Sequence, residues 1–291
     1  LMQSGLFTEM VLIDSDQARA EGEALDISHG VPFAKPMQIY AGNYDDLKDA
    51  GLIIITAGAN QKPGETRLDL VKKNIAIFKT IIPEIVKRDF KGILLIVANP
   101  VDILTSVALK LSGYTPNRVF GSGTVLDTAR LKYNLGQHLN VDSRSVHAFI
   151  IGEHGDSEIA AWSCANVSGI KLDKFCELRG YFNHKEATKR IAEEVKNSAY
   201  EIIARKKATY YGIAMSVRRI CEAIVRDEKS ILSISALLNG EYGISGVALS
   251  LPAIVNRQGV ETHVPLQLND EEVAALKQSA ATLKKILEEN E

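Results

Sequence analysis

The run Leu52–Ala59, with the sequence LIIITAGA, carries the pattern that decides the fold class. Its first five residues are apolar or β-branched, which is typical of a strand buried inside a sheet. It ends in small residues around Gly58, where the backbone can turn and approach another group closely. A second run of the same kind, Gly92–Val97, ends at Ala98–Pro100. Each run therefore predicts a buried strand that ends in small or polar residues.

A helical pattern separates the two runs. Apolar residues between Leu70 and Ile85 recur close to helical spacing, and Pro83 is expected to kink that helix. The other strands expected in this half are Glu9–Asp14, Met37–Tyr40 and Val119–Gly121, and the other helical segments are Gln17–Ser28, Tyr44–Ala50 and Val101–Ser112. Strands that alternate with helices predict an α/β fold, with a doubly wound parallel sheet covered by helices on both faces.

The carboxyl ends of these strands are the expected ligand site, because sheets of this kind bind ligands there. Asp14, Gly58 and Asn99 all fall at strand ends. The alternative is that they are ordinary strand-end residues, but their position at one edge favours a site. An acid in the position of Asp14 would bind a ribose 2′-hydroxyl and favour NAD over NADP. The G-x-G-x-x-G loop of dinucleotide sites is not found, and we expect it, with a first strand, upstream of Leu1.

The pattern changes from Leu126 onward. We expect helices at Asp127–Leu139, Asn183–Lys206 and Ala214–Val225, and a last helix, Glu271–Glu289, capped by Asn269 or Asp270. The expected strands are Val146–Ile151, Ala160–Val167, and an antiparallel pair, Ser230–Leu238 and Gly246–Val255, around a turn at Tyr242 and Gly243. The sequence therefore predicts a first domain at residues 1–122 and a mixed α+β second domain at residues 123–291.

The composition limits the classes of function. Of the 291 residues 46% are hydrophobic and 24% are charged, and the formal net charge is −2. This balance gives no reason to expect a nucleic-acid or anionic-lipid partner. No apolar run approaches the ~20 residues that a membrane span needs. Three cysteines without paired spacing, Cys164, Cys176 and Cys221, suit a reducing compartment, so we expect a cytoplasmic protein.

The segment Ile150–Glu158 places His154 in a glycine-flanked loop at the end of a buried run. By itself this could be a loop histidine bonded to a backbone carbonyl. Asp127 and Arg130 lie three residues apart and share one helix face. They are either a surface ion pair of little energetic value or functional: Asp127 would orient the imidazole and favour its charged form, and Arg130 would hold a carboxylate. Arg67 follows a Pro-Gly loop, as a closing lid requires, and could polarise a carbonyl.

Three motifs together resemble one family. Gly152–Asp156 (GEHGD), Asp127–Arg130 (DTAR) and Gln61–Leu68 (QKPGETRL) are similar to those of bacterial L-lactate dehydrogenases, in the lactate/malate dehydrogenase superfamily. The resemblance covers essentially the whole chain. It implies a Rossmann domain that binds NAD, a catalytic domain, and the glycolytic and fermentative reduction of pyruvate by NADH.

The resemblance also implies roles for individual residues. His154 would be the proton donor and acceptor, Asp127 its partner, Arg130 the carboxylate anchor and Arg67 the lid arginine. The positions that match family contacts to NAD are Asp14, Tyr44, Gly58, Ala59, Thr80, Val97, Asn99 and Ser122. Asn99 would also contact the substrate.

Two further positions are expected to choose the substrate. Malate-specific members of the family carry an arginine where this chain has Gln61, and a neutral side chain cannot pair with the second carboxylate of oxaloacetate. Thr209 matches a pocket threonine of lactate enzymes. Malate dehydrogenase is the nearest alternative. The chain could also be an inactive relative, similar to a lens crystallin, but such a protein does not need the four catalytic side chains that are all present here. A zinc enzyme using His147 and His154 would need a more usual ligand spacing.

Regulation is a last expectation from the resemblance. Many bacterial relatives are homotetramers activated by fructose 1,6-bisphosphate, which binds a basic residue and a histidine across a subunit interface. The matching positions here are Lys132 and His147, with His147 expected at the start of the strand that leads to His154. Lysine stands where arginine is usual, and it would bind phosphate as a point charge.

Overall fold

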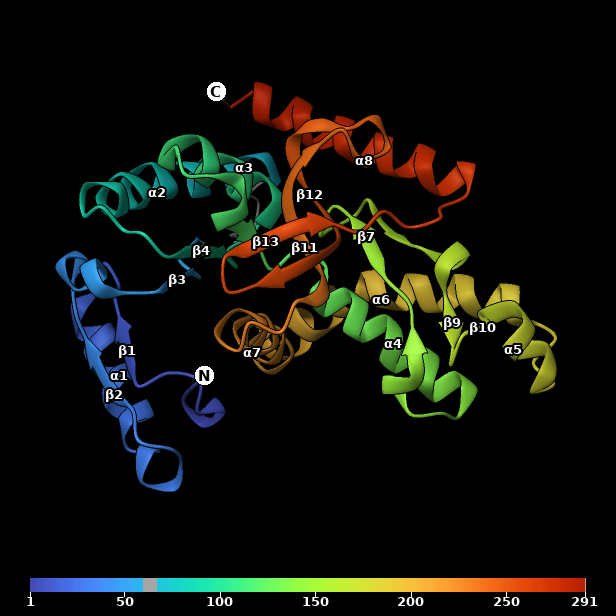
Figure 1. The fold of residues 1–291 in the computed structure, drawn as a ribbon, viewed down its shortest axis with the longest axis horizontal. Coiled ribbons are helices and arrows are strands. Elements are labelled where there is room, and N and C mark those ends of the chain that lie inside the picture. The colour runs from blue at the N-terminus through green and yellow to red at the C-terminus, as the bar shows by residue number, and fades with distance from the viewer. Residues whose placement is uncertain (60–66, 291) are drawn as a thin grey trace.

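The computed structural model describes residues 1–59 and 67–290 (Figure 1). The helices are α1 (Gln17–Ser28), α2 (Arg67–Lys87), α3 (Val101–Ser112), α4 (Val125–Leu139), α5 (Leu172–Leu178), α6 (His184–Lys206), α7 (Tyr211–Val225) and α8 (Asp270–Glu288). The strands are β1 (Glu9–Leu12), β2 (Gln38–Ala41), β3 (Leu52–Ile55), β4 (Ile93–Ile96), β5 (Val119–Gly121), β6 (Val146–His147), β7 (Ile150–Gly152), β8 (Glu158–Ala160), β9 (Asn166–Val167), β10 (Ile170–Lys171), β11 (Ser230–Asn239), β12 (Ser245–Asn256) and β13 (Gly259–His263).

The two runs that predicted buried strands form β3 and β4. They pair in parallel, with Leu52 opposite Ile93, and β5 continues the parallel order beside β4. All four residues of β4 are buried, as expected for a strand covered on both faces. The predicted α/β class with a parallel sheet is therefore confirmed.

The sheet does not end at the expected domain boundary. Its order is β3-β4-β5-β11-β12-β7-β8, and β11 pairs antiparallel to β5 through Ser235 and Gly121. Strands β11 and β12 pair antiparallel, as predicted, and β13, which the sequence did not indicate, pairs with β12. Strands from both sides of residue 122 thus share one sheet, while the division into two domains stays a prediction.

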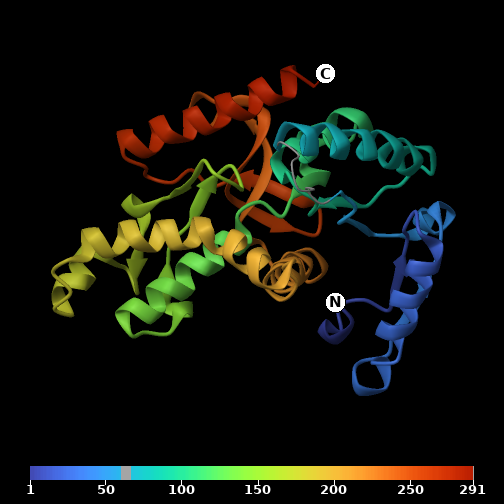
Figure 2. The same ribbon diagram turned by 180° about the vertical axis from the view of Figure 1, so that it is seen from behind.

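Strands β1 and β2 form a separate two-stranded parallel sheet, with Glu9 opposite Gln38. Figures 1 and 2 show β1, α1 and β2 as a unit at one side of the molecule. A 3₁₀ helix, Tyr44–Asp49, leads from this unit to β3, and Arg88, directly after α2, bonds Asp45 at 3.0 Å. This ion pair connects the 3₁₀ helix to the end of α2.

Two strand predictions in the second half were wrong. Val146–Ile151 is divided between β6 and β7: β6 pairs with β9 in a small sheet, whereas β7 pairs with β8 and β12. Ala160–Val167 is divided by a 3₁₀ helix, Trp162–Cys164, into β8 and β9. The apolar pattern marks burial, and here it is shared between two sheets with different partners. The sequence also gave no indication of α5 or β10.

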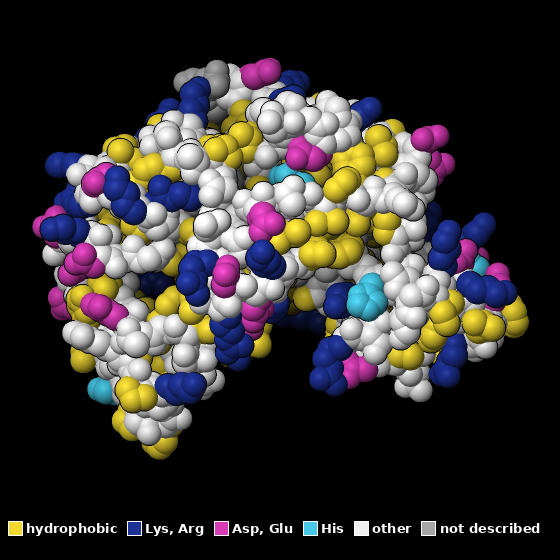
Figure 3. Space-filling model, viewed as in Figure 1, with side chains coloured by type: hydrophobic (Ala, Val, Ile, Leu, Met, Phe, Trp, Pro, Cys, Tyr) yellow, Lys and Arg dark blue, Asp and Glu magenta, His cyan; other side chains and the backbone are white. Residues whose placement is uncertain are grey.

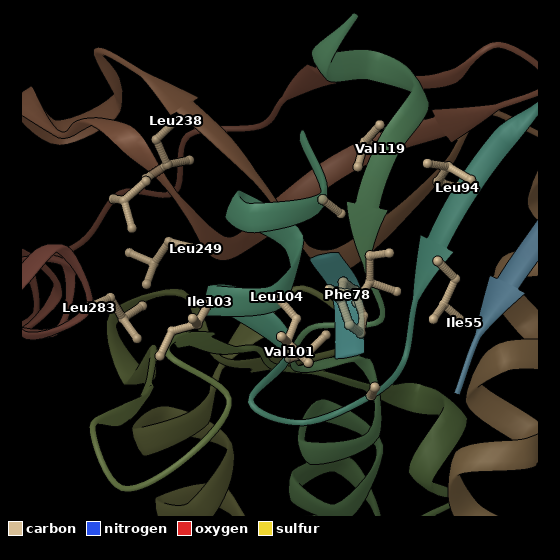
Figure 4. Close-up of a cluster of buried hydrophobic side chains, with 14 of the residues drawn as sticks. Ile55, Phe78, Leu94, Val101, Ile103, Leu104, Val119, Leu238, Leu249 and Leu283 are labelled. Atoms are coloured by element: carbon tan, nitrogen blue, oxygen red, sulfur yellow. The ribbon is translucent and has the colours of Figure 1, made fainter. Parts of the chain in front are cut away.

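The core lies between the large sheet and its helices. Figure 4 shows Phe78 of α2, Leu104 of α3 and Leu283 of α8 converging with side chains from the strands. Phe78 and Leu104 are fully buried, and burial of side chains of this size stabilises the fold by about 1.5–3 kcal/mol each. This packing fixes the strand ends beside α2 and α3.

Helix ends follow the residues that the sequence offered. Gly113 ends α3 with a φ of 63°, in the left-handed region that glycine adopts without strain. Asn269 and Glu272 form a reciprocal capping box at the start of α8. On the face in Figure 3, basic and acidic side chains are interspersed. None of the described helices is both long and apolar enough to cross a membrane.

Candidate active site

His154 and Asp127 form the centre of the site. His154 follows β7, and its ring Nδ1 lies 2.5 Å from Oδ2 of Asp127, in the first turn of α4. The Asp127 side chain is only 2% exposed, whereas that of His154 is 23% exposed. Among the described residues, none forms a hydrogen bond with the His154 Nε2 atom. The buried acid therefore holds one ring nitrogen and leaves the other for a ligand.

Arg130 belongs to the same cluster. Its Nη1 donates to Oδ1 of Asp127 at 2.8 Å, so both oxygens of that carboxylate are occupied by positive groups. Burial opposes the ionisation of Asp127, but the charges and hydrogen bonds of His154 and Arg130 hold the pKa of that carboxyl below its usual range. Asp127 is therefore a carboxylate, and the alternative of a weak surface pair is wrong for this buried cluster.

The protonation of His154 follows from this neighbourhood. Burial alone would lower its pKa, but the Asp127 carboxylate, assisted by Asp102 and Glu158, raises the pKa of His154 to about 9. The imidazole is therefore an imidazolium at neutral pH. An imidazolium whose second ring nitrogen has no protein partner among the described residues can donate a proton to a bound oxygen.

The loop that carries His154 is anchored to other elements. Gly152 has a φ of 88°, which permits the turn after β7. The backbone N–H of Glu153 donates to the Ser279 hydroxyl of α8 at 3.0 Å, and the Glu153 carboxylate accepts from the Ser157 hydroxyl. These bonds fix the loop in place, so the imidazole is held rather than free to swing.

The carboxyl ends of β3, β4 and β5 meet beside α2. The N–H of Val97 donates to Ile55, and the N–H of Ser122 donates to Ile96, which continues the ladder past the strands. Asn74 of α2, 1% exposed, accepts from the N–H of Ala59 and donates to the carbonyl of Asn99, both at 2.7 Å. Asn74 lies inside a helical pattern without a motif of its own, so the sequence did not indicate its role.

Comparison with known proteins identifies this arrangement. The NAD-binding domain profile of lactate/malate dehydrogenases matches residues 1–121, and the profile of the α/β C-terminal domain matches residues 124–291. The chain belongs to the lactate/malate dehydrogenase family.

Members of the family with L-lactate dehydrogenase names are similar over nearly the whole chain. The protein of Acetivibrio thermocellus is 55% identical, with 99% of this chain and 90% of that protein covered. The protein of Thermoanaerobacterium saccharolyticum is 54% identical, covering 99% and 93%. A lactate dehydrogenase from a Medee basin deep-sea metagenome superposes with a TM-score of 0.95 at 48% identity, covering 99% and 92%. The minor L-lactate dehydrogenase of Enterococcus mundtii, in its ligands-bound form, gives 0.95 at 44% identity, covering 100% and 92%.

The family's NAD-binding domain makes NAD the cofactor, and the residues at the strand ends fit it. Gly58 is exposed, so a ligand can approach the backbone closely. The Asp14 carboxylate is exposed at the end of β1 and accepts from the N–H of Asp16. Its position suits ribose hydroxyls, which carboxylates bind in dinucleotide sites.

Tyr44 and Thr80, two further positions expected to contact NAD, make contacts within the protein. Tyr44 is half-buried, with the Arg88 guanidinium 5.4 Å from its ring centre. Thr80 is exposed on α2, and its hydroxyl donates to the Ile77 carbonyl of the same helix. Their contact with NAD stays a prediction.

Three expected substrate contacts are not tested by the described geometry. Gln61 lies outside the described residues. The backbone of Arg67 begins α2, but its side chain also lies outside the described part. Thr209 is half-buried in the connection between α6 and α7. The role of each stays a prediction.

The expected regulatory positions lie on neighbouring elements, but one detail was wrong. Lys132 is half-buried on α4, where burial lowers its pKa. His147 is exposed in β6. It does not begin the strand that leads to His154, because β6 belongs to the small sheet and β7 to the large one.

A further acidic residue, Glu158, was not singled out as a site residue from the sequence. It lies in β8 opposite Gly152, on the face of the hairpin that also bears Ala160 and Ile150. Burial and the charge of Asp127 raise the pKa of Glu158 to about 8. Among the described residues, no three or more His, Cys, Asp or Glu side chains form a cluster that could hold a metal ion.

Proposed function

We propose that this chain is an NAD-dependent L-lactate dehydrogenase that reduces pyruvate to L-lactate and catalyses the reverse oxidation. The observation that carries the proposal is the cluster of His154, Asp127 and Arg130, in which a buried carboxylate holds an imidazolium and a guanidinium together. A proton donor beside a carboxylate anchor suits a 2-oxo acid. The names of the relatives at 50–55% identity agree with this activity.

Arg130 would hold the substrate carboxylate. Only its Nη1 is engaged with Asp127 among the described hydrogen bonds, which leaves its other donors for a bidentate contact. That contact would place the carbonyl oxygen of pyruvate next to Nε2 of His154. Orientation of this kind lowers the entropic part of the barrier.

His154 would then act as the general acid. Bound NADH would supply hydride for the carbonyl carbon, and the imidazolium would give its proton to the carbonyl oxygen, so that an alcohol would form. Asp127 stabilises the imidazolium and keeps Nδ1 engaged throughout. Arg67 would polarise the carbonyl from the lid loop, and Asn99 would contact both nicotinamide and substrate.

Gln61 and Thr209 would favour pyruvate over oxaloacetate. A second carboxylate needs a cation or it loses its solvation without compensation, and Gln61 is neutral. Malate dehydrogenase activity is the second candidate, because the family includes both activities.

We further propose a cytoplasmic homotetramer with fructose 1,6-bisphosphate as an activator bound near Lys132 and His147. The half-buried amine of Lys132 and the exposed imidazole of His147 support an anion site there.

The test is an NADH oxidation assay on the full-length protein. Pyruvate should give a kcat/KM at least tenfold above that of oxaloacetate, and the reverse preference would replace lactate by malate dehydrogenase. His154→Asn should nearly abolish turnover but keep NADH binding, measured by fluorescence. Near-normal pyruvate turnover in that variant would remove His154 from the mechanism. Absence of turnover in the wild type would favour the inactive relative.

A further inference from the structure

Asp102 is a buried acid that the mechanism above does not use. It lies in the first turn of α3 and is 2% exposed. Its Oδ2 accepts a hydrogen bond of 2.8 Å from the backbone N–H of His154. Helix α3 begins directly after Asn99 and Pro100, so one side chain joins the end of β4 to the catalytic loop.

A buried carboxylate at this place is costly unless nearby groups stabilise its charge, because burial disfavours the ionised form. Burial raises the pKa of Asp102 to about 6, while the Ser235 hydroxyl, the His154 N–H and the His154 charge oppose that rise, and Glu153 adds to it. At neutral pH the acid is therefore mainly ionised. A neutral amide could hold the backbone N–H equally well, so the hydrogen bond alone does not account for an acid.

Hydroxyl groups lie around Gly121 and Gly123, and one of them, that of Ser235, opposes the rise in the pKa of Asp102. A Cβ on Gly121 would lie 2.6 Å from the Thr105 hydroxyl and 3.2 Å from Cβ of Ser235. A Cβ on Gly123 would lie 2.6 Å from the Ser250 hydroxyl. The two glycines thus leave room for hydroxyls from α3, β11 and β12. Hydroxyl dipoles that can turn toward a carboxylate lower the cost of keeping it charged in the interior.

The charge of Asp102 also acts on the imidazole. Asp102 is one of the groups that raise the pKa of His154, together with Asp127 on α4 and Glu158 on β8. Asp127 contacts the ring of His154, whereas Asp102, from the first half of the chain, contacts the backbone N–H of the same residue. The two acids therefore act on one residue from two different helices, α3 and α4.

We propose that Asp102 is a positioning residue for His154, which fixes the catalytic loop through the backbone N–H and adds a second negative charge that favours the imidazolium. This inference rests on the proposed role of His154 as general acid. Asp102 thereby links the start of α3, which follows β4, to the proton donor, and no sequence motif indicated this link.

Two substitutions separate position from charge. Asp102→Asn keeps an oxygen that can accept from His154 but removes the charge. Asp102→Ala removes both. Ser112→Ala is the matched control, since Ser112 is buried in the last turn of the same helix and its hydroxyl donates only to the Leu109 carbonyl. Each full-length variant is assayed for pyruvate kcat and KM from pH 5.5 to about 10, with NADH binding and Tm measured in parallel.

For Asp102→Asn we expect the alkaline decline of kcat/KM to move down by roughly 0.5–1 pH unit, as removal of one nearby charge in a partly solvated site requires. For Asp102→Ala we expect that shift and a fall in kcat of roughly tenfold or more, because the loop also loses its anchor. Ser112→Ala should keep the wild-type profile. If Asp102→Asn fails to fold, the pH profile of Asp102→Ala, which also lacks the charge, tests the same shift.

An active wild type whose pH profile is unchanged in Asp102→Asn or, in its place, in Asp102→Ala would overturn the role of the charge. A kcat in Asp102→Ala equal to that of Ser112→Ala would overturn the role in position, even if both variants had a lowered Tm. A wild type without pyruvate turnover would instead overturn the proposed function itself.

Discussion

His154 carries a proton at neutral pH because its ring lies against a buried carboxylate. Exposed histidines titrate near pH 6.5, and here Asp127 raises the pKa to about 9 despite burial. Protonated His154 therefore stabilises the folded state. This stabilisation is fully present below the ordinary histidine pKa and is lost as the pH rises through about 9. The raised pKa of His154 matters for function, because pyruvate reduction needs the charged imidazolium and lactate oxidation needs the neutral imidazole.

The first prediction concerns this pair. In the wild type, kcat/KM for pyruvate should fall as the pH rises through about 9, the raised pKa of His154. Asp127→Asn should move the decline toward the ordinary value near pH 6.5 and lower kcat by roughly 10²–10⁴-fold. Lactate oxidation should show the opposite pH dependence. Asp142→Asn, which removes an exposed acid paired with Arg144, is the control and should change neither. An unshifted Asp127→Asn profile would separate this acid from the proton donor.

A second prediction at this scale concerns substrate choice. Gln61→Arg should raise the ratio of kcat/KM for oxaloacetate to that for pyruvate by roughly tenfold or more, because the new cation pairs with a second carboxylate and pyruvate leaves it unpaired. Lys48→Arg, at a position in the first half outside the predicted site, is the control. A ratio that stays constant would place Gln61 outside the pocket.

At the scale of elements, three helices hold the catalytic loop. Helix α3 contributes Asp102, α4 contributes Asp127 and α8 contributes Ser279, each through hydrogen bonds to the segment that follows β7. On the cofactor side, α2 plays a corresponding part, since Asn74 connects the loops after β3 and β4. Buried amides that satisfy two backbone groups are costly to remove, because each partner is left without a hydrogen bond.

The third prediction follows from that amide. Asn74→Ala should lower the free energy of unfolding by about 1–3 kcal/mol and weaken NADH binding several-fold, because Ala59 and Asn99 lose their common partner. Denaturant unfolding and fluorescence titration measure the two effects. Lys72→Ala, exposed two residues earlier on α2, should change neither. A destabilised Asn74→Ala with unchanged NADH affinity would limit Asn74 to a role in folding.

At the scale of the molecule, the two halves share a sheet, so a change in one half has a covalent and hydrogen-bonded route to the other. The pairing of β5 with β11 places Gly121 opposite Ser235. Gly121 is the last residue of β5, and the next residue, Ser122, is one of the expected cofactor positions. The small sheet of β6, β9 and β10 lies beside α4, as Figure 1 shows. Helix α4 therefore carries both Asp127 and Lys132, and it contacts β6, the strand of His147.

The last prediction tests regulation. Fructose 1,6-bisphosphate should lower the apparent KM for pyruvate in the tetramer, because a ligand activates only if it binds the active state better. Lys132→Ala should lose most of this response, and Lys48→Ala, an exposed lysine in the first half, should keep it. Light scattering with and without the sugar bisphosphate measures the oligomer. A flat wild-type response would rule out activation, and equal responses of both variants would place the site elsewhere.

The sequence by itself determined the local structure and the chemical groups of the site. Helix α1 spans the expected Gln17–Ser28 and α3 the expected Val101–Ser112, and β5 has the expected bounds. Apolar periodicity, caps and glycine turns act within a few residues of each other, so these elements can be predicted from a short window. The pairing of Asp127 with Arg130 was predictable for the same reason, since three residues along a helix place two side chains on one face.

Only the tertiary structure decided what lies between distant segments. The split of Val146–Ile151 between two sheets, the joining of β5 to β11, and the bonds of Asn74 and Asp102 all depend on partners far away in the sequence. An apolar run shows that a strand is buried but does not show which strand it pairs with, and a buried amide or acid looks like any other polar residue of a helix. Their roles arise from packing, which brings groups together across the chain with no local pattern to mark them.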